Sequence, residues 1–101
     1  MTQHSELMAG RWFTLTLAEQ LGNVGSEYSR AVSNRKRNDQ ARFNAALVRF
    51  LELLDLTIID PRWSVSRKRE LLRLREVSCE DFPENLQSYF DIFVGVARKN
   101  N

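Results

Sequence analysis

The 101-residue sequence has few of the residues from which disulfide scaffolds, metal centres and nucleophilic active sites are built. Cys79 is its one cysteine and His4 its one histidine. One thiol cannot close an internal disulfide, and this pair cannot supply the ligands of a Cys/His zinc site. His4 is also far from Cys79 along the chain and is a poor partner for activating a thiol. We therefore expect a protein that is not an enzyme and that uses no metal or cofactor.

Long apolar runs, glycine and proline are scarce as well. No apolar run approaches the roughly 18 residues that a membrane span needs. Residues 3–6 (QHSE) lack the basic and apolar regions of a signal peptide. We therefore expect a soluble cytoplasmic protein that does not contact the membrane. With four Gly and two Pro there is no linker-like stretch, and residues 1–101 are expected to form a single domain.

The spacing of apolar residues is helical along almost the whole chain. Thr16 followed by Glu19 has the spacing of a capping box, which predicts a first helix over about residues 17–33. Three more helices are expected, from a cap at Asn38 or Asp39 to Ile59, from a cap at Ser64 or Ser66 to about Phe82, and from Pro83 to about Ala97. Four amphipathic helices with short connections predict an all-α, antiparallel up-down four-helix bundle. A short N-terminal segment before it is expected to pack Trp12 and Phe13 on the core.

Small residues form one line along the first predicted helix, beside its apolar stripe. They are Ala18, Gly22, Gly25 and Ser29. Each glycine inside a helix costs about 1 kcal/mol relative to alanine, so something should require the two of them. We predict that this row allows close packing of a neighbouring backbone or aromatic ring. A groove for a ligand or a nucleic-acid backbone, and a helix kink, are the alternatives.

The second predicted helix carries apolar residues on the side away from its core face. Arg49 and Glu52 suit that outer side, but Val48, Leu56 and Ile59 do not. An apolar flank of this kind is typical of a contact with another chain, so these three residues predict self-association. In the alternative interpretation, the Trp12 segment covers them.

The net charge of +2 is unevenly distributed. Residues 30–75 hold twelve basic and five acidic residues, whereas both ends of the chain are acidic. The candidate contacts to nucleic acid are Arg30, Arg35, Lys36, Arg37 and Arg42 around the first loop and Arg62, Arg67, Lys68, Arg69 and Arg73 around the second. Such clusters bind phosphates without reading base sequence. In an up-down bundle the two loops lie at opposite ends, so one continuous patch needs assembly of subunits. The other interpretation is a solvated polar rim.

Two further features favour structural roles. Arg75 lies in the apolar stripe of the third predicted helix, so either its stem covers apolar surface or it pairs with Glu27 or Asp55. Glu52 and Asp55 have the spacing of a carboxylate pair that could hold Mg²⁺, but the other helices offer only scattered acidic residues. A magnesium-dependent nucleotide hydrolase is therefore the least favoured function.

Four runs of the chain resemble those of a group of small uncharacterised prokaryotic all-helical proteins. They are residues 19–27 (EQLGNVGSE), 53–57 (LLDLT), 60–63 (DPRW) and 74–76 (LRE). The resemblance extends over most of the chain. It implies a helical fold and brings no activity with it.

A second resemblance involves residues 23–27 (NVGSE), Arg30, Phe43 and residues 51–53 (LEL), taken in that order. In this respect the chain is similar to the four-helix-bundle proteins encoded in 23S rRNA intervening sequences and to the accessory variability proteins of diversity-generating retroelements. That resemblance implies a pentameric, barrel-like bundle with a basic surface that contacts RNA and a protein such as a reverse transcriptase.

These observations together favour a non-enzymatic helical bundle that self-associates and serves as a binding or scaffolding protein. An accessory protein that binds the RNA or DNA backbone through its arginine-rich clusters is the alternative.

Overall fold

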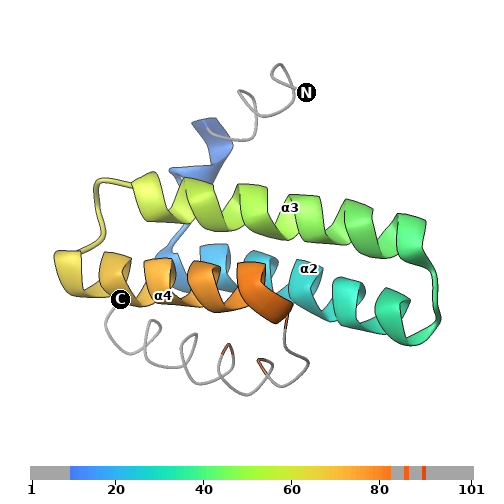
Figure 1. Cartoon of the computed structure of the whole chain (residues 1–101). Helices are drawn as coiled ribbons and strands as arrows, with labels where there is room; N and C mark the ends of the chain where they lie inside the picture. The colour runs from blue at the N-terminus through green and yellow to red at the C-terminus, as the bar shows by residue number, and fades with distance from the viewer. Residues whose placement is uncertain (1–9, 83–85, 87–89, 91–101) are drawn as a thin grey trace.

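The computed structural model describes residues 10–82, 86 and 90. This part of the chain is helical and contains no strand, which confirms the predicted all-α class. Three helices lie within it: α2 spans Leu17–Lys36, α3 spans Gln40–Ile59 and α4 spans Val65–Asp81 (Figure 1). The predicted fourth helix, residues 83–97, lies outside the described residues apart from Leu86 and Phe90.

Each of the three helices begins at a side-chain cap. The Thr16 hydroxyl accepts a hydrogen bond from the backbone N–H of Glu19 at 3.1 Å, and the Glu19 carboxylate accepts one from the N–H of Thr16 at 2.8 Å. Asp39 caps α3 and Ser64 caps α4, each by accepting from the N–H three residues later. These bonds satisfy N–H groups that the first turn of a helix leaves without partners. The predicted capping box is confirmed, and Asp39 and Ser64 hold the other two caps.

Helix α2 is longer than predicted, because it continues to Lys36 instead of ending near residue 33. Arg35 and Lys36 therefore lie in its last turn, where positive charge interacts favourably with the helix dipole. The chain then reverses through Asn38, whose φ of 59° lies in the left-handed region that asparagine tolerates better than most residues. The first connection is thus a short turn.

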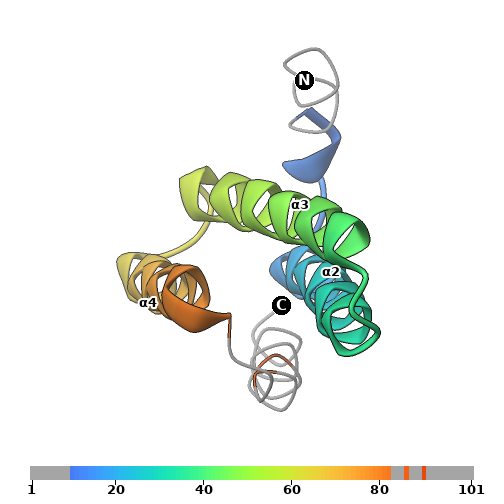
Figure 2. The ribbon, with the colours of Figure 1, turned by 45° about the vertical axis from the view of Figure 1, so that its right-hand side comes forward.

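Contacts between the helices show that neighbours run in opposite directions. The middle of α2 meets the middle of α3, where Arg49 lies 3.3 Å from the Glu27 carboxylate. Arg35 near the end of α2 lies over the ring of Phe43 near the start of α3. Phe82, directly after α4, packs against the same Phe43 ring. Figure 2 shows α3 lying over α2 on one side and α4 on the other.

Aromatic rings fill the core where these helices meet. Tyr28 lies 5.2 Å from Phe82 and 5.4 Å from Phe90, measured between ring centroids. Phe50 packs edge-on against the same two phenylalanines. The buried Tyr28 hydroxyl accepts a hydrogen bond from the N–H of Leu86 at 2.8 Å. Ring pairs of this kind stabilise a core by about 1 kcal/mol beyond the burial of their surface.

Among the described residues, the row of small residues on α2 meets a packed ring at Gly25 but not at Gly22. A Cβ on Gly25 would lie 3.6 Å from the Phe90 ring, which is ordinary van der Waals contact, so the ring packs on the helix with room for no more than a methyl group. Ala18 is buried, whereas Gly22 and Ser29 are exposed. A Cβ on Gly22 would meet no atom of the described residues within 4 Å. At Gly22, close packing therefore finds no support among the described residues.

We expect Gly22→Ala to raise the free energy of unfolding by about 0.5–1 kcal/mol, because alanine favours the helix and the position has room for its methyl group. Gly25→Leu should instead lower it by about 1–3 kcal/mol, because the larger side chain must displace Phe90. Urea unfolding followed by circular dichroism measures both. A destabilising Gly22→Ala would contradict the structure.

Candidate functional site

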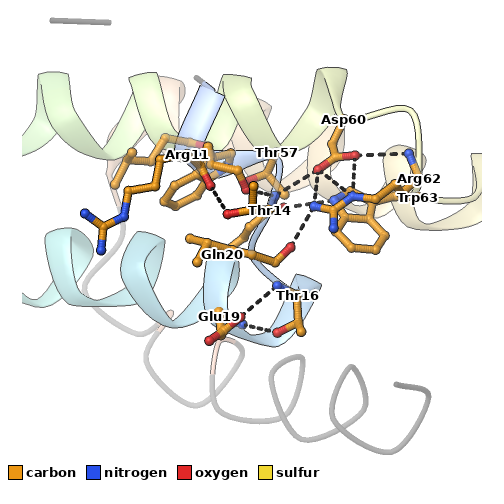
Figure 3. A network of polar contacts seen from close by, with 12 residues as sticks. Arg11, Thr14, Thr16, Glu19, Gln20, Thr57, Asp60, Arg62 and Trp63 are labelled. Carbon is orange, nitrogen blue, oxygen red and sulfur yellow. Dashed lines mark hydrogen bonds and ion pairs between the residues drawn. The ribbon is translucent and has the colours of Figure 1, made fainter. Parts of the chain in front are cut away.

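A buried polar network joins the N-terminal segment, α2 and the end of α3 (Figure 3). At its centre is Asp60, the residue that ends α3, with none of its surface exposed. Its carboxylate accepts hydrogen bonds from the Arg62 guanidinium at 2.6 and 3.0 Å, from the Arg62 backbone N–H at 3.0 Å and from the Gln20 amide at 2.9 Å. The local cause is the Asp-Pro-Arg sequence, in which Pro61 ends the helix and the turn brings Arg62 back to the carboxylate.

Two tryptophans surround this carboxylate and complete the network. Trp12 donates from its indole N–H to the Thr57 hydroxyl at 3.0 Å, and its carbonyl accepts from Gln20 at 2.9 Å. Trp63 donates to the Gln20 side-chain oxygen at 2.8 Å and lies under the Arg62 guanidinium. Among the described residues, no buried side-chain nitrogen or oxygen lacks a hydrogen-bond partner. The network is therefore saturated, and its groups hold the fold together.

The ionisation of Asp60 follows from these contacts. Burial alone would raise the pKa of Asp60, but the hydrogen bonds from Arg62 and Gln20 favour the charged form and lower the pKa to about 2, from an ordinary value of 3.8. The same pair raises the pKa of the Arg62 guanidinium. A fully buried carboxylate with a lowered pKa, held by Arg62 and Gln20, has the properties of a structural ion.

Arg62, a residue of the predicted basic clusters, belongs to this network, and Arg35 of the same clusters makes other internal contacts. Arg62 also donates to the Leu15 carbonyl at 2.6 Å. Arg35 donates to the Phe82 carbonyl at 2.6 Å, and its guanidinium lies within 5.5 Å of the ring centroids of both Phe43 and Phe82. Arg35 and Arg62 therefore join segments of the chain, and their contact with nucleic acid stays a prediction.

The remaining basic residues divide into paired and unpaired groups. Arg30 lies 2.9 Å from Glu27, and Arg42 lies 3.6 Å from Asp39. Arg67 is half-buried and also has an interaction partner. The residues that form no ion pair with another described residue are Lys36, Arg37, Lys68, Arg69 and Arg73. They lie at the two ends of α3, as predicted for an up-down bundle, and do not form one patch (Figure 1).

Arg75 and Asp55 form the ion pair that the sequence left as one of two alternatives. The Arg75 Nε lies 2.6 Å from Asp55 Oδ1 and its Nη2 lies 3.3 Å from Oδ2. The carboxylate proposed for a magnesium site with Glu52 is thus already neutralised. Within the part of the chain that the structure describes, no three His, Cys, Asp or Glu side chains come together in a way that could hold a metal ion.

Exposed apolar residues lie on α3 and α4. Val48 is 55% exposed and Ile59 is 61% exposed, whereas Leu56 is half-buried against the core. The Trp12 segment packs at Thr57 and does not cover Val48 or Ile59. The structure adds Val65 and Leu72 of α4, which are 68% and 49% exposed and which the sequence analysis did not identify. The sequence does contain an indication of this exposure, because Leu72 is apolar and lies outside the apolar helix face formed by Leu71 and Leu74.

No helix among the described residues combines the length and the apolar character needed to cross a membrane. Comparison of the chain with family models, curated proteins and solved structures finds no match. The two resemblances noted in the sequence therefore stay predictions. The exposed apolar and basic residues are therefore the features that bear on function.

We expect Asp60→Asn to lower the free energy of unfolding by about 3 kcal/mol at neutral pH, because it leaves Arg62 without its charged partner in the network. Since the folded pKa of Asp60 lies below its ordinary value, the stabilisation is present above about pH 4 and is lost as the pH falls towards 2. Chemical denaturation at neutral pH and near pH 2 measures the free energy of unfolding of the wild type and the variant. The two values should differ at neutral pH and become similar in acid.

Glu52→Gln is the matched control, because Glu52 is an exposed carboxylate that forms no ion pair with a described residue. It should change the stability little at either pH. An equal loss for Asp60→Asn at both pH values would show that the charge of Asp60 is not what the network uses.

Proposed function

We propose that this chain is a non-enzymatic binding or scaffolding module that self-associates through the outward sides of α3 and α4. One observation carries the proposal. The large apolar side chains that stand most exposed among the described residues are Val48, Ile59, Val65, Leu72 and Val77, and all of them lie on these two helices. Helix α2, which is described in full, has none.

This distribution favours a contact surface over ordinary surface composition. Isolated exposed aliphatic residues are normal in soluble proteins. Here such residues gather on two neighbouring helices, and a third helix has none of them. Burial of apolar area contributes about 25 cal/mol per Å², so an association that covers these exposed side chains would be stabilised by their burial. The polar network around Asp60 supports the proposal that the chain is not an enzyme, because its buried polar atoms already have hydrogen-bond partners within the fold.

We expect the wild-type protein to run at a multiple of its 11.8 kDa monomer mass in light scattering coupled to size exclusion at micromolar concentration. The variant with serine at Val48, Ile59, Val65 and Leu72 should run as a monomer with unchanged helix content, because these side chains are exposed and contribute little to the core. Ser33→Ala on the exposed side of α2 is the control and should keep the wild-type mass. A wild type that is monomeric at this concentration would refute the proposal.

Binding of a nucleic-acid backbone is the second candidate. It is supported by Lys36 and Arg37, which are exposed at the turn after α2 and form no ion pair with a described residue. The basic residues of α4 support it less, because Glu76 and Glu80 on the same helix would repel phosphates.

If this candidate is right, the affinity for RNA or DNA falls steeply between low and physiological salt. Arg37→Glu should weaken binding of any sequence and reduce the slope of log affinity against log salt by about one per lost phosphate contact. Arg11→Glu makes the same charge change at an exposed site away from the turn and should have the smaller effect. Fluorescence anisotropy measures both, and equal losses would assign the effect to net charge alone.

A further inference from the structure

The charges of α4 are arranged against its helix dipole. Its first three turns carry Arg67, Lys68, Arg69, Arg73 and Arg75 against a single acidic residue, Glu70, and the rest of the helix carries Glu76, Glu80 and Asp81. The first turn has no acidic residue and the last turn no basic one. Each such misplaced charge costs an isolated helix about 0.3–1 kcal/mol. The arrangement therefore does not serve α4 by itself.

Internal contacts do not account for these charges either. Arg75 is paired with Asp55 of α3. Arg69 and Glu76 are exposed, and neither forms an ion pair with another described residue. Arg73 and Glu80 are exposed and unpaired in the same sense. Helix α4 thus presents to solvent a positive half followed by a negative half.

An apolar stripe runs between the same charges. Val65, Leu72 and Cys79 are exposed and follow one another at intervals of seven residues, which keeps them close to one line along a helix. Arg69 and Glu76 are also seven residues apart and lie directly beside this line. Leu72 stands near the middle of α4, Val65–Asp81.

A helix with these features matches its own copy when the copy is reversed. Rotation by 180° about an axis through Leu72 places Val65 against Cys79 of the other copy and Arg69 beside its Glu76. On the other flank it places Lys68 beside Arg75 of the other copy, whose charge is paired with Asp55. The rotation makes each of these contacts twice, as an isologous contact requires. A parallel two-fold pair would instead bring Arg69 beside Lys68 of the other copy, because it joins opposite flanks of the two helices, and like charges repel.

We infer that α4 forms an antiparallel two-fold contact with α4 of a second copy of this chain, with Leu72 at the axis and Arg69 of each copy paired with Glu76 of the other. This inference rests on the proposed self-association and names the surface that performs it. The complementarity also separates a second copy from a polyanion, because a nucleic acid would satisfy Arg69 and Arg73 but be repelled by Glu76 and Glu80.

Charge reversal in the full-length chain tests the pairing. Arg69→Glu and Glu76→Arg should each weaken the dimer about tenfold in sedimentation equilibrium, because two attractive pairs become two repulsive ones. The double variant Arg69→Glu/Glu76→Arg should return to wild-type affinity, since it restores both pairs with the signs exchanged. Arg37→Glu makes the same charge change at the end of α2 and should leave the dimer intact.

A disulfide at the axis tests the geometry independently of affinity. Leu72→Cys/Cys79→Ser should form a covalent dimer under mild oxidation, because the two new thiols face each other across the axis. Val77→Cys/Cys79→Ser places an exposed thiol on another side of α4 and should stay uncrosslinked.

The outcomes separate the two proposals. A protein that is oligomeric in its wild-type form, keeps its mass in the Arg69→Glu variant and gives no disulfide at position 72 overturns the α4 contact and leaves self-association standing. A wild type that is monomeric at micromolar concentration overturns both. Weakening by each single reversal without recovery in the double variant overturns the Arg69 to Glu76 pairing.

Discussion

The buried carboxylate of Asp60 is the constraint on which the arrangement of the helices depends. A charge without surface exposure is tolerated only when hydrogen bonds replace the lost water, and here the donors come from Gln20 of α2 and from Arg62 in the loop after α3. Gln20 in turn holds Trp12 and Trp63. One ion therefore determines where the N-terminal segment, α2 and the α3–α4 loop lie relative to one another.

Internal use of arginine changes what the outside of the molecule can offer. In the most basic part of the sequence, Arg35 binds the Phe82 carbonyl and lies over the Phe82 ring, and Arg62 pairs with Asp60. Arg75 is held by Asp55. A planar guanidinium suits these tasks, because it can donate in several directions while it stacks on an aromatic ring. Fewer guanidinium groups are consequently available to a phosphate than the composition indicates, and the exposed apolar residues of α3 and α4 become the more informative feature.

The parts of the fold that the sequence predicts are those with local causes. The caps at Thr16, Asp39 and Ser64 depend on side chains three residues from the N–H groups they satisfy, so the sequence identifies Thr16 and leaves one alternative for each of the other two. The sequence predicts the end of α2 near residue 33, but the helix continues to Lys36. Positive charge in the last turn is favourable there, and this cause does not show in the spacing of apolar residues. The pairing of Arg75 with Asp55, although foreseen as one alternative, required knowledge of which helices adjoin.

The network around Asp60 could not be predicted, because its bonds join residues far apart in sequence. Gln20 and Asp60 are 40 positions apart, and Trp12 and Thr57 are 45 positions apart. Such separations also bear on how the chain folds. The α2–α3 hairpin closes through a short turn and is entropically inexpensive, so we expect it to form before the bonds to Asp60, which need its two ends together. We likewise expect docking of the N-terminal segment to be a late folding step, with burial of Trp12 as its optical probe.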